Sequence, residues 1–95
     1  MKNNKKYDWW VIQTKPQAEF IAIEQLSNQG FITYCPFYRK ESIRRHQIKI
    51  ETVPLFSRYI FSKVTELAKE KIHIIRSTKG VNKLLKIGES PMIVS

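Results

Sequence analysis

Proline and glycine divide the first third of the chain into a strand, a helix and a second strand. Residues 8–14 are rich in aromatic and β-branched side chains, which is typical of a buried strand. Pro16 follows directly, and a helix accepts proline only in its first turn. Gly30 then offers a natural helix stop. We therefore predict a helix over residues 16–29 and a short strand over residues 31–35.

The predicted first helix has a capping pattern and one apolar face. Thr14 and Gln17 have the Thr-x-x-Gln spacing of a capping box. Four apolar side chains share one broad face and are assigned to the core: Ala18, Ala22, Ile23 and Leu26. A different edge carries Ile21, Gln25 and Gln29 at intervals of four residues, so these side chains are expected to face solvent.

The middle of the chain changes character and predicts an extended arm. Residues 37–53 show no helical stripe, and residues 47–51 alternate between polar and apolar side chains, as in a half-exposed strand. We therefore expect a long hairpin arm with its tip near residues 44–46. No Asn-Gly or Asp-Gly pair marks the turn, so the register is left open.

The last third of the chain predicts a strand, a helix and a final strand. Alternation over residues 55–64 is the clearest strand signal. A short helix capped near Thr65 suits residues 65–75, and residues 81–87 suit a strand that a loop over 88–91 follows. The side chains expected to point inward from the second helix are Leu67, Ala68, Ile72 and Ile75.

This order of elements predicts an α+β domain of the split βαβ kind. We expect a four-stranded antiparallel sheet flanked by helices, as in ferredoxin-like folds, with a protruding β-hairpin. A chain of 95 residues supports one small domain, here residues 8–95 after a disordered lead-in over residues 1–7. Nothing that could cap the sheet follows Pro91, so we expect the domain to be part of a longer protein.

Charge is the strongest compositional signal. Seventeen Lys and Arg against eight Asp and Glu give a net charge of +9, which favours a polyanionic partner such as nucleic acid.

The single cysteine, Cys35, excludes a disulfide within the chain and fits a reducing cytoplasm. Two histidines are too few for a Cys/His zinc site, and no apolar run is long enough to span a membrane. We expect no metal and no cofactor.

Four sequence segments in order resemble the N-terminal (NGN) domain of NusG-type transcription elongation factors. They are Trp9-Trp10-Val11-Ile12-Gln13-Thr14-Lys15, Pro54-Leu55-Phe56-Ser57-Arg58-Tyr59-Ile60-Phe61, Arg76-Ser77-Thr78-Lys79-Gly80-Val81 and Gly88-Glu89-Ser90-Pro91-Met92-Ile93-Val94. The resemblance covers residues 8–95 and is closest to the specialised paralogue RfaH.

The resemblance implies a bacterial antitermination factor and not an enzyme. Such domains bind the clamp helices of the largest RNA polymerase subunit, bridge the DNA channel and suppress pausing. RfaH-like members also contact the non-template single-stranded DNA in the transcription bubble. In the full-length proteins a separate C-terminal KOW domain, which lies outside this sequence, recruits the ribosome or a termination factor.

The resemblance assigns the polymerase contact to aromatic side chains of the strand over residues 55–64. Tyr59 and Phe61 match the anchor positions, and two aromatic rings on one strand face form a compact apolar hot spot. The alternative is that both rings belong to the core. Weaker candidates for the surroundings of this contact are Leu55, Phe56 and Gln13.

The resemblance assigns non-template DNA to a mixture of basic, amide and apolar side chains. Lysines attract phosphates, glutamines can bond base edges, and aromatic faces stack on bases. The residues that match DNA-contacting positions of RfaH-like proteins are Lys15, Gln25, Gln29, Thr78 and Lys79. Further candidates beside them are Trp9, Arg76 and Ile21, the last of which stands where RfaH has a basic residue. The arm adds candidates for duplex phosphates, namely Arg39, Lys40, Arg44 and Arg45. For each of these residues the alternative is an ordinary solvated or packed side chain.

Two other functions compete with this interpretation. A four-stranded sheet could belong to a general RNA-binding module, although the Lys/Arg-Gly-Phe/Tyr-x-Phe recognition pattern is missing. A nuclease or other enzyme with a basic cleft is disfavoured, because the sequence has no paired carboxylates, histidine cluster or Gly-rich phosphate loop.

Overall fold

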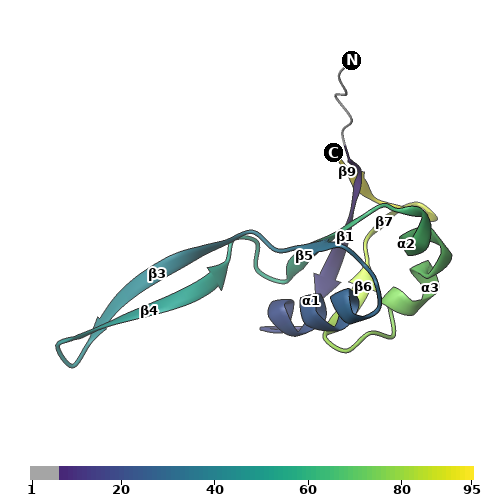
Figure 1. Ribbon diagram of the computed structural model, residues 1–95. Helices are drawn as coiled ribbons and strands as arrows, with labels where there is room; N and C mark the ends of the chain where they lie inside the picture. Colours follow the sequence, from purple (N-terminus) through teal and green to yellow (C-terminus); the bar gives the residue numbers. More distant parts are fainter. Residues whose placement is uncertain (1–6) are drawn as a thin grey trace, which may run out of the picture.

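A computed structural model describes residues 7–95 (Figure 1). Residues 1–6 of the predicted lead-in lie outside the described residues. The strands are β1 (Trp9–Thr14), β2 (Thr33–Tyr34), β3 (Phe37–Arg44), β4 (Gln47–Pro54), β5 (Tyr59–Lys63), β6 (Val81–Leu84), β7 (Lys86–Ile87), β8 (Ser90–Pro91) and β9 (Ile93–Val94). The helices are α1 (Glu19–Asn28), α2 (Glu66–Glu70) and α3 (Ile72–Ile75). Over residues 7–95 no helix has the length and apolarity that a membrane span requires.

The main sheet confirms the predicted α+β class with antiparallel strands. Its order is β2-β5-β1-β6, and β9 pairs with β1 as a fifth strand. The prediction of four strands was therefore one strand short. β6 covers only the end of β1, from Ile12 to Thr14, which leaves the same edge open at Trp9 and Trp10. The two residues of β9 pair there, and so short a strand has no alternation that a sequence could reveal.

Alternate residues of the central strands build the core on one face of the sheet. Trp10 and Ile12 of β1 and Ile60 of β5 are buried there. Leu26 of α1 and Ile75 of α3 join them in one hydrophobic cluster. The helices therefore cover one face of the sheet, and the odd-numbered residues of β1 and β5 lie on the opposite, open face.

The first helix starts later than the sequence predicts. α1 begins at Glu19 and has no side-chain cap, so the predicted capping box is wrong. Thr14 cannot cap the helix because it is still part of β1, fully buried. Gln17 then adopts a left-handed φ of 59°, which a helical residue cannot have. The predicted stop is confirmed: α1 ends at Asn28, and Gly30 follows with a φ of 97°.

The predicted helix over residues 65–75 is divided into α2 and α3 at Lys71. Thr65 caps α2 as predicted, because its hydroxyl accepts the amide of Ala68 at 3.0 Å. The prediction that Leu67 points into the core was wrong, since 43% of it is exposed. Ala68 takes the inward position of this short helix and is fully buried.

Three predicted strands are shorter than their sequence patterns. The strand expected over residues 31–35 pairs only at Thr33–Tyr34. The strand expected over residues 55–64 begins only at Tyr59, because residues 55–58 form a turn. The last strand breaks at Leu85, and the loop expected over residues 88–91 includes β8, which pairs with β7.

β3 and β4 form a two-stranded arm that projects far from the sheet and the helices (Figure 1). Eight residue pairs connect the strands, from Phe37 opposite Pro54 to Arg44 opposite Gln47. The two residues between the strands are Arg45 and His46, with φ angles of 54° and 66°. Two left-handed residues in a two-residue loop are the mark of a type I′ turn, which suits the natural twist of a hairpin.

Candidate functional site

The open face of the sheet carries aromatic side chains from three neighbouring strands. Phe61 of β5 lies opposite Val11 of β1 and opposite Tyr34 of β2. Trp9 shares this face, and its ring lies 6.2 Å from that of Tyr34 between centroids. Phe56, in the turn before β5, meets the ring of Phe61 edge-on at 6.1 Å. Such aromatic pairs are favourable and hold the rings in fixed positions.

These rings line an open groove of about 380 Å³. Its lining residues are Trp9, Tyr34, Pro36, Leu55, Phe56, Phe61, Val94 and Ser95. Leu55 and Phe56 are 53% and 49% exposed, which is a large exposure for apolar side chains next to one another. An apolar groove with several exposed rings can take the apolar face of another chain.

The groove contains three of the five predicted polymerase-contact residues. Leu55, Phe56 and Phe61 line it, and Phe61 is only half-buried. The other two, Tyr59 and Gln13, face each other across β5 and β1, where the Gln13 amide donates to the Tyr59 hydroxyl at 3.4 Å.

Sequence reasoning missed the groove residues Tyr34, Pro36, Val94 and Ser95. Tyr34 has a usable signal, because it is an aromatic residue in a strand that pairs with Phe61. Val94 has none, since it reaches the groove through β9. Trp9, predicted to stack on a base, lies in the groove with Tyr34.

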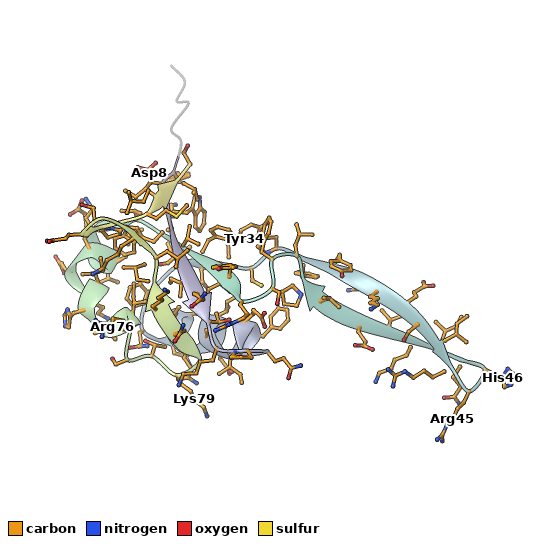
Figure 2. All side chains as sticks on the ribbon, turned by 180° about the vertical axis from the view of Figure 1, so that it is seen from behind. Asp8, Tyr34, Arg45, His46, Arg76 and Lys79 are labelled. Carbon is orange, nitrogen blue, oxygen red and sulfur yellow. The ribbon has the colours of Figure 1, made fainter. Side chains whose placement is uncertain are left out.

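Two loops bring exposed cations together at the opposite end of β1. The amide of Lys15, which follows β1, donates to the carbonyl of Gly80 at 2.9 Å. This bond places the loop of Lys15 beside the loop of Lys79, and both lysines are exposed. Arg76, also exposed, precedes Lys79 in the second loop (Figure 2). Gly80 also packs closely against α1, since a Cβ there would lie 3.0 Å from the backbone nitrogen of Ala22.

Of the two glutamines predicted to read bases, Gln29 has its side-chain amide engaged within the fold. This amide donates to the Thr78 hydroxyl at 3.0 Å and to the backbone carbonyl of Gln25 at 3.1 Å. Thr78 is buried, and its hydroxyl donates to Ile74 at 3.0 Å. Gln29 and Thr78 therefore fasten α1 to the loop that carries Lys79. Ile21 of α1 is 44% exposed, and Gln25 is half-buried.

The basic residues of the arm form a second, separate region. Arg45 lies at the tip, far from Arg76 and Lys79 (Figure 2). All four predicted arm residues are exposed: Arg39, Lys40, Arg44 and Arg45. Apart from Trp9, which lies in the aromatic groove, the structure therefore groups the predicted basic DNA contacts into two regions, at the end of β1 and along the arm.

A buried carboxylate fixes the turn between the arm and β5. Glu19 is 5% exposed, and its Oε2 accepts the backbone amide of Arg58 at 2.7 Å. Arg58 has a left-handed φ of 70°, and its Nε donates to the Thr14 carbonyl at 3.1 Å. The Arg58 carbonyl in turn accepts the Thr14 amide at 2.8 Å.

Burial, and then the charge of Glu19, raises the pKa of the Cys35 thiol above its ordinary value, so this thiol is poorly suited to act as a nucleophile.

Within residues 7–95, no three side chains of His, Cys, Asp or Glu come together in a way that could hold a metal ion.

Residues 7–95 match the model of a protein family described as "Transcription termination factor nusG". No curated protein matches the chain.

Proposed function

The chain belongs to the NusG family, whose members act in transcription elongation and termination, and we propose that it binds RNA polymerase and suppresses pausing. The single observation that carries this proposal is the aromatic groove on the open face of the sheet. Polymerase interaction is general in this family of transcription factors. The more specific assignment proposed here is that the groove receives the clamp helices of the largest subunit.

The groove suits a helical partner on physical grounds. Helices commonly bind by laying an apolar face into an apolar groove, and aromatic anchors supply most of the binding energy in such contacts. The half-buried Phe61 lines the groove, and Leu55 and Phe56 line it as exposed side chains. We assign Tyr59 and Gln13 to the margin of the same contact.

We further propose that the end of β1 contacts the non-template DNA strand, as in RfaH-like proteins. Lys15, Arg76 and Lys79 supply positive charge for phosphates. Ile21 and Gln25 belong to α1, which the bond from Gln29 to Thr78 fastens to the loop of Lys79. Arg44 and Arg45 of the arm are proposed to contact duplex phosphates. Both proposals assume that the protein acts in the cytoplasm with a KOW domain as its neighbour in the full-length protein.

The test of the polymerase contact is the double substitution Tyr59→Ala with Phe61→Ala. Loss of one ring in the groove and one at its margin should weaken binding to purified core polymerase on the order of 100-fold, as measured by biolayer interferometry. Both rings are half-buried, so their removal can also destabilise the fold. Circular dichroism reports whether the fold survives. Should it not survive, Leu55→Ser with Phe56→Ser tests the same groove from its exposed side.

The matched control is Ile87→Ser, which removes a side chain that is 71% exposed and does not line the groove. This variant should bind polymerase like the parent. Folded groove variants with parental affinity would contradict the proposal.

A general RNA-binding function is the second candidate, because one observation favours it. Trp9, Tyr34 and Phe61 lie on the open face of an antiparallel sheet, the arrangement on which RNA-binding sheets stack bases. The same groove variants distinguish the two functions. If the rings bind RNA, the substitutions should abolish RNA binding and leave the affinity for polymerase unchanged.

A further inference from the structure

The register of the arm separates its side chains into two chemically different faces. On one side Ile43 lies opposite Ile48, Glu41 opposite Ile50, and Arg39 opposite Thr52. We call this side the isoleucine face, after Ile43, Ile48 and Ile50. On the other side lie Lys40, Ser42, Arg44, Gln47, Lys49 and Glu51, which we call the basic face.

The isoleucine face is unusually exposed for its composition. Ile43, Ile48 and Ile50 are 75%, 68% and 59% exposed. Ile43 and Ile48 are direct cross-strand neighbours next to the tip, and Ile50 is two residues from Ile48 on the same side of β4. Single exposed apolar residues are ordinary, but a contiguous exposed group on a projecting element marks an interaction surface.

We propose that the isoleucine face is a second protein-docking surface, which packs against the same partner that binds the aromatic groove. This proposal rests on the proposed function, since it takes RNA polymerase as that partner. It assigns the arm two simultaneous contacts, with protein on the isoleucine face and nucleic acid on the basic face.

The charges of the two faces favour protein over nucleic acid on the isoleucine face. Arg39 and Glu41 balance each other there, whereas the basic face has Lys40, Arg44 and Lys49 against Glu51. A carboxylate beside the isoleucines disfavours phosphate. An apolar centre with charges of both signs at its edge is the usual composition of a protein–protein contact.

The small size of the isoleucine face favours a partner that is already anchored elsewhere. A stable dimer buries roughly 800 Å² on each partner, and three isoleucines supply only a fraction of that area. A second copy of this chain would therefore be held weakly. A partner held in the aromatic groove meets the arm at a high effective concentration, at which a small contact contributes to affinity.

The arm is built to reach such a contact. Eight paired residues in each strand extend the isoleucine face to roughly 25 Å from the sheet, at about 3.3 Å per residue. The two-residue turn at Arg45 and His46 closes the ladder without a flexible loop. The contact at the tip is therefore distinct in place from the groove.

The experiment replaces Ile43 and Ile48 together by threonine in the full 95-residue chain. Threonine keeps the β-branched shape that strands favour and removes the apolar surface. We expect binding to core polymerase without nucleic acid to weaken about 3- to 10-fold. Binding to a DNA duplex should stay unchanged. Amide chemical shifts of Lys40 and Lys49 report whether the arm remains paired, and Ile50→Thr is the milder variant if it does not.

The matched control is Lys40→Gln with Lys49→Gln on the basic face, which should leave the polymerase affinity unchanged and weaken duplex binding. Parental polymerase affinity of the threonine variant would overturn the proposal, as would a loss of duplex binding in that variant. Sedimentation that shows an isoleucine-dependent dimer would overturn it in favour of a second copy. Failure of the proposed function is distinguishable, because the aromatic variants would then also bind polymerase like the parent.

Discussion

At the scale of single residues, Arg58 connects the core to the proposed polymerase contact. Its backbone is left-handed, which costs a non-glycine residue roughly 1–2 kcal/mol. The Glu19 carboxylate stabilises this conformation through the Arg58 amide. Arg58 lies between Phe56 and Tyr59 in the chain, so the turn that Glu19 fixes also sets how these two rings are presented.

The first prediction is that Glu19→Ala destabilises the domain and Glu19→Gln does so much less. Alanine leaves the partly buried Arg58 amide without its acceptor, at a cost of about 1–3 kcal/mol, whereas the glutamine carbonyl can still accept it. Urea unfolding measures the stability, and the proton shift of the Arg58 amide reports the bond itself. Glu24→Ala removes an exposed carboxylate from the same helix and should change neither. Equal stability of the alanine and parent proteins would show that Glu19 does not hold the turn.

At the scale of elements, hydrophobic alternation predicts which side chains are buried better than it predicts where elements end. The pattern of β1 and β5 places Ile12 and Ile60 in the core, as periodicity requires. The boundaries at Gln17 and Arg58 depend on left-handed φ angles of 59° and 70°. A glutamine or an arginine in the sequence does not predict a left-handed conformation. At Arg58 tertiary hydrogen bonds stabilise this conformation. The sequence could therefore predict Phe61, the groove residue of β5, but not the turn that orients Phe56.

The tip of the arm gives an element-scale prediction. His46 has a φ of 66° in the type I′ turn, a position that strongly prefers glycine. His46→Gly should stabilise the arm by about 0.5–1 kcal/mol. Glycine removes the cost of the left-handed conformation, and the larger backbone entropy that glycine loses on folding offsets part of this gain. Hydrogen exchange of the amides in β3 and β4 measures this local change, which global unfolding does not resolve.

The control for the turn is Gln47→Gly, at the next position and the first residue of β4. Glycine at an extended strand position weakens strand pairing. This variant should therefore lower the protection of the β3 and β4 amides from exchange, which His46→Gly should raise. Faster exchange in the His46→Gly arm would mean that the histidine side chain, and not the backbone, stabilises the turn.

At the scale of the whole molecule, two groups of exposed cations contribute to the net charge of +9 and lie in different places. Lys15 and Lys79 are brought together by the bond between Lys15 and Gly80, whereas Arg45 lies at the far end of the arm (Figure 2). The aromatic groove is a third region, on the open face of the sheet. If these regions bind as proposed above, the domain can hold protein and DNA at once.

The last prediction separates the two basic regions by their response to salt. Each phosphate contact with a single strand contributes about −0.7 to the slope of log affinity against log salt. With three to four contacts the parent should show a slope of about −2 to −3 on single-stranded DNA, measured by fluorescence anisotropy. Lys15→Gln with Lys79→Gln should reduce this slope by about 1.4, since two phosphate contacts are lost.

The matched control is Arg44→Gln with Arg45→Gln, which removes the same charge from the arm. It should leave the single-strand slope unchanged while it weakens duplex binding. Equal effects of the two pairs on single strands would show that charge acts through the field of the whole domain, and a parent affinity that does not depend on salt would show that neither region contacts phosphate.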